Sequence, residues 1–379
     1  MTGRNILFAP AHYIYSKTKG SDRSVVYNTI HELSKQYFCY VICDENQINE
    51  VNNNLVIYEL GTNHNRMLFY KNLYTLTNKI INEKEVDLVH HMVPFGYQMT
   101  FNPSSILNKL NDMPFVCGAI NYPTINWEKD ILNDSLKFMT RYLQKKTLTE
   151  AEYLVFDSYK TMRIYQNEYK KVITEKPNDV IYDGVELDLF NFVPIEPKSK
   201  FTIFTAAPII ERKGIQYLIK AIASISHEYS ITLNIAGSGN YLEELKKLVK
   251  EYNLSTKVNF LGQIPREHIP KLMQASDLYV HPSTNETFPS ILREAMATGR
   301  PIVSTSVGFI NEHISSKNGT LVPSRNVDAL ANAIINLLSD FDLREKMSIA
   351  NRKHAEKEFS YEHIAKKWMN VYEMAINRV

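Results

Sequence analysis

Residues Asp277–Val303 read DLYVHPSTNETFPSILREAMATGRPIV, and this stretch decides the fold. A short apolar run ends at His281, as a buried strand does, and a polar loop follows it. Pro289 suits the first turn of a helix, because its missing N–H would have no intrahelical partner there. Apolar residues then recur at helical spacing until Gly299 and Pro301 end the helix and a second apolar run begins. The stretch therefore predicts a strand, a loop, a helix and a parallel strand.

Two carboxylates in this unit are candidate functional groups. Glu286 lies in the loop and Glu294 on the helix, at the carboxyl edge of a parallel sheet, where α/β proteins bind their ligands. Two carboxylates could form a glycosidase pair. In one continuous helix they would be offset by about 80°, but a helix start at Pro289 leaves Glu286 free to point elsewhere. With Arg293 beside Glu294, a solvated helix surface is the alternative interpretation.

The composition is that of a globular protein, and the length predicts two domains. The chain has 379 residues, of which 44% are hydrophobic and 22% charged, and its net charge is +2. Nucleic-acid binders have a stronger and more clustered basic excess, so no nucleic-acid partner is expected. No apolar run approaches the roughly 20 residues that cross a bilayer, and three cysteines argue against a disulfide framework. An N-glycosylation sequon at Asn285, inside the presumed site, favours a cytoplasmic location, because a sugar there would block the site.

Strand-like and helix-like segments alternate along the chain, which predicts α/β domains with mostly parallel sheets covered on both faces. Strands are expected at residues 6–9, 38–43, 55–59, 86–91, 115–119, 153–156, 180–182, 201–205, 231–236, 258–261 and 278–280 and from 302. Helices are expected at 23–36, 66–82, 134–149, 158–168, 214–226, 241–252, 266–274, from 289, and at 328–338, 343–357 and 361–377. Leu189–Lys200, with two prolines and mixed charges, is expected to link the domains. The last helix has an apolar face that must dock on another element.

Two loops between a strand and a helix suit phosphate groups. Arg212 and Lys213 precede Gly214 at a helix start, where two cations beside helix N–H groups can bind a diphosphate. Ordinary surface charge is the alternative for such a pair. The second loop reads AGSGN at 236–240, and its glycines allow close approach of backbone or ligand. Leu242 occupies the third glycine position of the dinucleotide fingerprint, so that motif fails here.

The ordered set of motifs from about Lys200 to the C-terminus resembles the donor-binding domain of retaining family 4 glycosyltransferases, which have the two-domain GT-B fold. The matching pieces are Arg212-Lys213-Gly214, Ala236-Gly-Ser-Gly239, Val258-Asn-Phe-Leu-Gly262, Ala275-Ser-Asp277, Pro282-Ser283, Glu286-x-Phe288-Pro289, Glu294-Ala-Met-Ala-x-Gly-x-Pro301, Asn318-Gly319 and Phe359-Ser360. The resemblance implies two Rossmann-like, doubly wound domains that face each other across a cleft, with the C-terminal helix crossing back to the first. The acceptor-binding domain is expected over 1–193 plus about 360–379, and the donor-binding domain over 194–359.

The resemblance also implies a role for each matching residue. A nucleotide-sugar donor, with a UDP-sugar favoured and a GDP-sugar as the alternative, would lie across the C-terminal domain. Arg212 and Lys213 would hold its diphosphate and neutralise the charge that builds on the leaving nucleotide. Glu286 would bind the sugar hydroxyls and Glu294 the ribose hydroxyls. Further donor contacts are expected from Gly20, Gly237, Gly239, Gly262, Ile264, Phe288, Pro289 and Ser290.

The implied reaction transfers a glycosyl group to an acceptor hydroxyl of a glycan, glycolipid or other glycoconjugate, with retention at the anomeric carbon. Retention without an enzymic nucleophile suggests front-face attack, in which a donor phosphate oxygen takes the acceptor proton. No metal or other cofactor is expected, because family members commonly need none. The alternatives are another GT-B enzyme, such as an inverting transferase or a phosphorylase, and a catalytically silent sugar-nucleotide-binding protein.

The acceptor side departs from the family pattern. Many relatives carry a histidine just after the strand that corresponds to residues 115–119, where this chain has Asn121 as a substitute hydrogen-bonding residue. His91, at the end of the preceding strand, is a second candidate for contact with substrate, and a structural histidine is the alternative. The helix at 134–149 places basic residues beside aromatic ones, which suggests contact with an anionic membrane at its inner face. Docking of the helix's apolar side into the first domain is the more common arrangement. The basic residues are Lys137, Arg141, Lys145 and Lys146.

Overall fold

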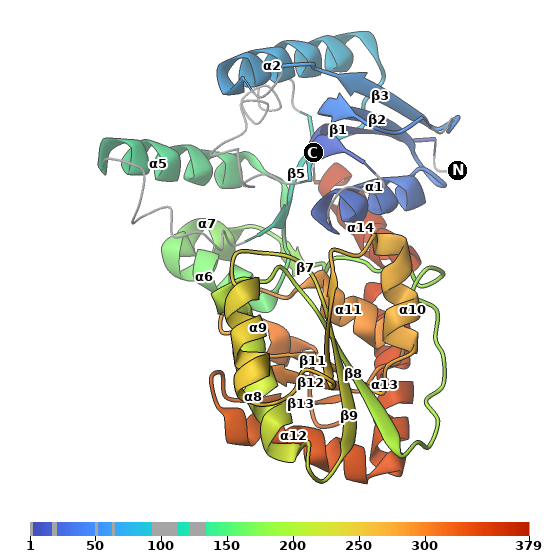
Figure 1. Ribbon diagram of the computed structural model, residues 1–379. Helices are drawn as coiled ribbons and strands as arrows, with labels where there is room; N and C mark the ends of the chain where they lie inside the picture. The colour runs from blue at the N-terminus through green and yellow to red at the C-terminus, as the bar shows by residue number, and fades with distance from the viewer. Residues whose placement is uncertain are drawn as a thin grey trace. The chain divides into compact units, whose positions relative to one another are not determined.

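The computed structural model describes residues 3–16, 21–49, 52–62, 65–92, 113–121 and 134–378, and Figure 1 shows their helices and strands. The chain forms two compact units. The first contains Met1–Gly184 and Tyr361–Val379, and the second contains Val185–Ser360. The units divide after Gly184, whereas the sequence analysis placed the boundary after residue 193.

The first unit is built on a parallel sheet whose described strands follow the order β3-β2-β1-β4-β5-β6-β7. They are β1 (Asn5–Tyr15), β2 (Phe38–Asn46), β3 (Leu55–Glu59), β4 (Leu88–His91), β5 (Phe115–Ile120), β6 (Tyr153–Phe156) and β7 (Asn178–Val180). The order reverses at β1, which pairs in parallel with β2 on one side and β4 on the other. This is the doubly wound arrangement expected from the βα alternation.

Helices cover both faces of this sheet. The described ones are α1 (Ser21–Leu33), α2 (Arg66–Glu83), α5 (Asp134–Glu150), α6 (Tyr159–Glu168), α7 (Lys170–Glu175) and α14 (Tyr361–Ile376). The last of these completes the first unit from the far end of the sequence. Trp368 and Tyr372 on its apolar face are buried in the same core as Ile6 and Ile30. The prediction that the C-terminal helix returns to the first domain is therefore confirmed.

The second unit has its own parallel sheet, with the strand order β10-β9-β8-β11-β12-β13. The strands are β8 (Lys200–Ala206), β9 (Ser230–Ala236), β10 (Val258–Gly262), β11 (Leu278–His281), β12 (Ile302–Thr305) and β13 (Gly319–Val322). Ile203 on β8 pairs with Leu233 on β9 and with Leu278 on β11, so the order reverses at β8. Open sheets of this kind bind their ligands at the carboxyl ends of the strands beside that reversal.

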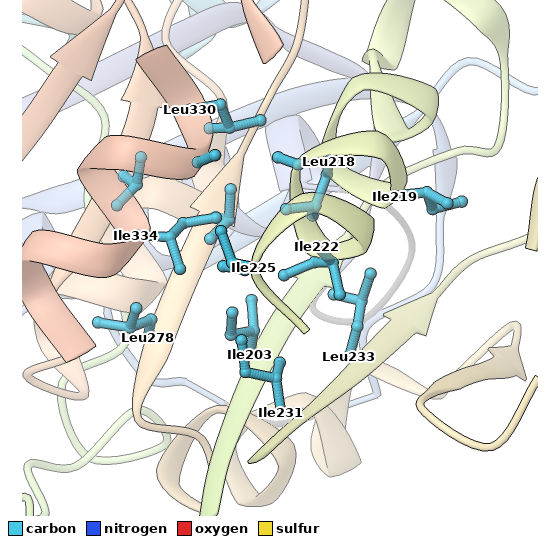
Figure 2. Packing of buried hydrophobic residues seen from close by; sticks show 14 of the residues in the cluster. Ile203, Leu218, Ile219, Ile222, Ile225, Ile231, Leu233, Leu278, Leu330 and Ile334 are labelled. Atoms are coloured by element: carbon cyan, nitrogen blue, oxygen red, sulfur yellow. The ribbon is translucent and has the colours of Figure 1, made fainter. Parts of the chain in front are cut away.

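The helices of the second unit form two layers, with α8, α9 and α12 on one face and α10, α11 and α13 on the other (Figure 1). Their bounds are α8 (Ile215–Ile225), α9 (Leu242–Glu251), α10 (Ile269–Gln274), α11 (Ser290–Ala297), α12 (Val327–Ser339) and α13 (Phe341–Phe359), with short 3₁₀ turns η1 (Glu211–Lys213), η2 (Arg266–His268) and η3 (Ile310–Glu312). Figure 2 shows the aliphatic core between the first layer and the sheet, to which Leu218 and Ile222 of α8, Ile334 of α12 and the strand residues Ile203 and Leu233 contribute.

The segment expected to be a linker, Leu189–Lys200, is packed against the second unit. Phe190 is fully buried. Arg300, itself buried at the end of α11, donates hydrogen bonds to the carbonyl oxygens of Val193, Thr298 and Ser276. The ring of Phe192 fills the space beside Gly299, where an added Cβ would lie 2.4 Å from the Phe192 Cε2 atom. The segment predicted to link the domains thus belongs to the second unit, where its apolar side chains provide anchors.

The described helices bear on two predictions about membranes. Of the helices that the structure describes, none combines the length and the hydropathy needed to span a bilayer. The basic helix expected at 134–149 is α5, on which Tyr142 is 56% exposed and Arg141 pairs with Glu168 at 3.4 Å. The side chain of Lys137 lies outside the described residues. Membrane contact by α5 stays a prediction.

Candidate active site

The Arg212-Lys213 turn and the loop after β11 meet at the carboxyl edge of the second sheet. Gly214, which ends the η1 turn, has φ +70° and lies against the loop so closely that an added Cβ would be 1.9 Å from the carbonyl oxygen of Pro282. Glycine is required here both for the left-handed backbone and for the close approach. The backbone N–H of Thr284 donates to the carbonyl of Arg212 at 2.8 Å and fastens the two segments together. Sequence positions about 70 residues apart thereby form one site.

Glu286 is held in this loop by cations. Lys213 Nζ donates a hydrogen bond to Glu286 Oε1, and both side chains are more than nine-tenths buried. Arg212 Nη1 lies 3.9 Å from the same oxygen and donates to the Asn285 carbonyl at 3.1 Å. His281 Nε2 lies 3.4 Å from the same oxygen. Burial is the largest effect on the pKa of Glu286 and would raise it, but His281 and Lys213 together lower that pKa to about 2.

Gly308 supports the loop from its other side. Its φ is +63°, and an added Cβ would lie 2.0 Å from the carbonyl oxygen of Glu286 and 2.3 Å from that of Thr287. The N–H of Phe309 donates to the Thr287 carbonyl at 2.9 Å. The sequence analysis missed Gly308. Its signal was a glycine just after β12, at the same edge of the sheet as the other loops.

Phe288, Pro289 and Ser290, which were also predicted to contact the donor, lie at the start of α11. Pro289 precedes the helix in an extended conformation, and no side chain caps the first turn at Ser290. The N–H groups of a first turn have no intrahelical partners and attract anions. The ring of Phe288 packs 4.5 Å from that of His313, and the Arg293 guanidinium lies 5.7 Å from the Phe288 centroid.

Glu294 is buried, not solvated. It is 4% exposed, as is Arg293, so the alternative of a solvated helix surface was wrong. Arg266 Nη1 donates to Glu294 Oε1 at 2.7 Å, and Arg266 Nη2 donates to Glu186 Oε2 at 2.7 Å. Burial raises the pKa of Glu294 from its ordinary value, and the positive charges of Arg266 and Arg293 offset this only in part. Arg266 and Glu186 were not identified from the sequence.

The predicted glycines have two kinds of surroundings. Gly237 and Gly239 meet backbone, since an added Cβ would lie 1.9 Å from the Ala207 carbonyl oxygen in one case and 2.2 Å from that of Ile209 in the other. They let the loop after β9 pack on the loop after β8. Gly262 has φ +71° with no heavy atom within 4 Å of an added Cβ, and Ile264 beyond it is half-buried. The edge next to Gly262 thus has space where the other two glycines have none.

Two further candidates, His91 and Asn121, belong to the first unit. His91 is fully buried, 4.2 Å from the ring centroid of Phe115, and burial holds its pKa well below the usual range. This placement favours a structural histidine. Asn121 is half-buried directly after β5, and Gly20 lies outside the described residues.

His90, next to His91, ties the sheet of the first unit to α14. The Gly118 carbonyl can only accept, so His90 Nε2 donates to it at 2.7 Å and His90 Nδ1 accepts from the Tyr372 hydroxyl at 2.7 Å. Burial lowers the pKa of His90 to about 3 and keeps the ring neutral.

Comparison with known proteins shows what this arrangement is similar to. Residues 188–354 match the model of the glycosyl transferases group 1 family. An uncharacterized glycosyltransferase of Methanocaldococcus jannaschii is 32% identical over 251 residues, which cover 61% of this chain and 64% of that relative. The match thus spans less than two thirds of the relative's length.

Solved structures resemble the whole chain. The crystal structure of a glycosyltransferase from Rickettsia africae has a TM-score of 0.78 at 19% identity and covers both chains fully. The Anabaena protein HepE in complex with UDP has a TM-score of 0.69 at 16% identity and covers 98% of this chain and 99% of its own. These likenesses show the fold, which is GT-B with two Rossmann-like, parallel-sheet units. The second unit is similar to the glycosyl transferases group 1 family, whose model matches residues 188–354 within it.

Proposed function

We propose that the protein is a retaining glycosyltransferase that moves a sugar from a nucleotide-sugar donor to an acceptor hydroxyl of a glycan, glycolipid or other glycoconjugate. The observation that carries this proposal is the buried Lys213–Glu286 pair at the carboxyl edge of the second sheet. It joins a cation suited to phosphate to an anion suited to sugar hydroxyls, in the unit that matches the family model.

In this function Lys213 links the two parts of the donor. An ammonium group has three N–H donors, so Lys213 can keep its bond to Glu286 and also bind a diphosphate oxygen. Arg212 is half-exposed beside it and offers a second cation. Together they would offset the negative charge that grows on the departing nucleotide, and this is electrostatic stabilisation of the transition state.

Glu286 would bind the donor sugar as an ionised group. With a pKa of about 2 it carries no proton at neutral pH, so it cannot serve as a general acid and is a weak base. An ionised carboxylate accepts hydrogen bonds from sugar hydroxyls and favours positive charge on the anomeric carbon. Front-face attack, with a donor phosphate oxygen taking the acceptor proton, then needs no enzymic base. We propose that this charge arrangement works without a metal ion.

The donor is proposed to be a UDP-sugar, with a GDP-sugar as the alternative. The structural likeness to HepE, whose structure contains UDP, supports a uridine nucleotide. The acceptor would bind the first unit, where Asn121 and the basic helix α5 are the candidate contacts. We propose a cytoplasmic enzyme that reaches membrane-linked acceptors at the inner face.

A thermal-shift screen with UDP-sugars and GDP-sugars tests the proposal, because a ligand that binds only the native state raises the apparent stability. We expect one donor class to raise the melting temperature and to show calorimetric binding. Lys213→Met should abolish that binding, whereas Lys250→Met, which removes an exposed lysine from α9, should leave it unchanged. Equal donor affinity in wild type and Lys213→Met would contradict the proposed site. The absence of binding to any donor would contradict the proposed function.

A further inference from the structure

Arg266 joins two acidic residues from distant parts of the second unit. Its two terminal nitrogens are each 2.7 Å from a carboxylate oxygen, Nη1 from Glu294 on α11 and Nη2 from Glu186 at the beginning of the unit. The Phe190 ring supports the guanidinium, with 5.4 Å between its centroid and Cζ. Phe190 therefore supports one face of the guanidinium, and the two carboxylates hold its two terminal nitrogens. These contacts fix the position of the guanidinium relative to Glu294.

The surroundings of Glu294 oppose its negative charge. The residue is buried, and burial raises its pKa. Glu186 acts in the same direction, while Arg266 and, from the same helix, Arg293 oppose it. The fully buried Tyr279 on β11 adds no positive charge. Arg266 is the first of the two cations in size of effect, so its removal would let Glu294 hold a proton at a higher pH.

We propose that Arg266 is a positioning residue for the nucleotide, which aims the Glu294 carboxylate at the ribose hydroxyls and keeps it in its ionised, acceptor-only form. The inference rests on the function proposed above. Arg266 donates to Oε1 of Glu294, so we assign the ribose hydroxyls to the other oxygen, Oε2. Glu186 and Phe190 act one step further away, by keeping the guanidinium in place.

A hydroxyl that donates to an ionised carboxylate makes a stronger bond than one that donates to a neutral carboxyl group. The nucleotide's preference for ribose over deoxyribose therefore reports the state of Glu294. If Arg266 had only a structural role, its loss would weaken the binding of ribonucleotides and deoxynucleotides equally. Loss of its positive charge near the diphosphate would also weaken the binding of both equally, at every pH.

The experiment measures calorimetric binding of UDP, 2′-deoxy-UDP and 3′-deoxy-UDP at pH 6 and pH 8.5, with the guanosine series used if the wild type prefers GDP. We expect the wild type to prefer the ribonucleotide at both pH values. In Arg266→Met, the ratio of the affinity for UDP to that for its deoxy forms should fall roughly tenfold at pH 6. At pH 8.5 the ratio should recover in part, because Glu294 is then ionised. Arg266→Lys, which keeps the charge but not the fork, should lie between them. Lys271→Met removes an exposed cation from the adjoining α10 and should match the wild type.

An unchanged ribose preference in Arg266→Met at both pH values would overturn the inference, even if UDP bound more weakly. A wild type that binds UDP and its deoxy forms equally would overturn it too, while leaving the proposed function in place. A wild type that binds neither UDP nor GDP would overturn both. Should Arg266→Met fail to fold, Arg266→Lys carries the test, because it keeps the charge but cannot hold Glu294 and Glu186 at the two ends of one planar fork. We then expect a loss of roughly threefold in the same ratio, and an unchanged ratio refutes the inference.

Discussion

The Lys213–Glu286 pair should contribute strongly to the stability of the second unit, and a double-mutant cycle can measure this. The side chains are 9% and 8% exposed, so water screens their attraction little. Removing one partner of a buried pair costs about 3–5 kcal/mol, because it leaves an uncompensated charge. His281 and Arg212 remain near Glu286, which places the cost of Lys213→Met nearer about 2–3 kcal/mol.

The pKa of Glu286 gives a second estimate of the same quantity. It falls from 4.5 to about 2 in the folded chain. At about 1.4 kcal/mol for each pKa unit, the ionised form is favoured by about 3 kcal/mol, which His281 and Lys213 share. Because the folded pKa is the lower one, this stability is fully present above pH 4.5 and is lost as the pH falls toward 2. The two estimates agree in size.

The assay is urea denaturation of the full chain, followed by circular dichroism, for the wild type, Lys213→Met, Glu286→Gln and the double variant. Because the chain has two units, the data are fitted with two transitions, and the coupling is read from the one that the variants shift. At pH 7 we expect each single variant to lose about 2–3 kcal/mol and the double variant to lose little more than one of them. Between pH 5 and pH 3, Glu286→Gln should lose less stability than the wild type does.

The exposed pair Lys246–Glu243 on α9 is the matched control, and the same cycle there should show no measurable coupling. Additive effects at Lys213 and Glu286, within about 0.5 kcal/mol, would refute the reasoning. They would mean that solvent reaches the pair despite its burial.

Two further predictions concern the backbone around the site. Gly308→Ala should destabilise the second unit by about 2 kcal/mol or more and weaken donor binding, because its Cβ would displace the carbonyls of Glu286 and Thr287. Gly61→Ala has a similar φ of +60° with nothing within 4 Å, and should cost only the left-handed backbone, about 1 kcal/mol, in the same denaturation assay; equal costs for the two would show that the loop yields freely. Arg300→Met should expose the segment Leu189–Lys200 to limited proteolysis under native conditions, because four carbonyls lose their donor, among them that of Val193. A digestion pattern like that of the wild type would show that the apolar contacts of the segment hold it without Arg300.

Local patterns predicted the elements well, and the reason is physical. Strand β3 and strand β6 were expected at their observed bounds, because a short apolar run between turn residues has few other conformations available. The unpredicted β13 at Gly319–Val322 has only two apolar residues in a four-residue strand. It forms because parallel pairing with β12 completes the sheet edge, and that contribution is tertiary.

The candidate site was predicted in part, for a similar reason. Arg212, Lys213 and Glu286 lie in loops whose position follows from the strand order, and the structure brings them together. The partners of Glu294 could not be read from the sequence, because Arg266 and Glu186 are 80 residues apart and meet only through packing around Phe190. His91 was given two interpretations, substrate contact and a structural role. The strand that carries it is buried to its last residue, which favours the structural role.

The two glutamates differ in chemistry although they have the same side chain. Burial opposes ionisation at both sites, and the outcome depends on what each carboxylate contacts. Glu286 has a lysine and a histidine close to one oxygen, and its pKa falls to about 2. Glu294 has an arginine that it shares with Glu186, so the compensation is incomplete and its pKa rises. A group that is always ionised cannot donate a proton, and a group locked to an arginine is poorly placed to carry one to an acceptor. Neither glutamate is therefore suited to acid–base work, and this supports assigning the acceptor's proton to the donor phosphate.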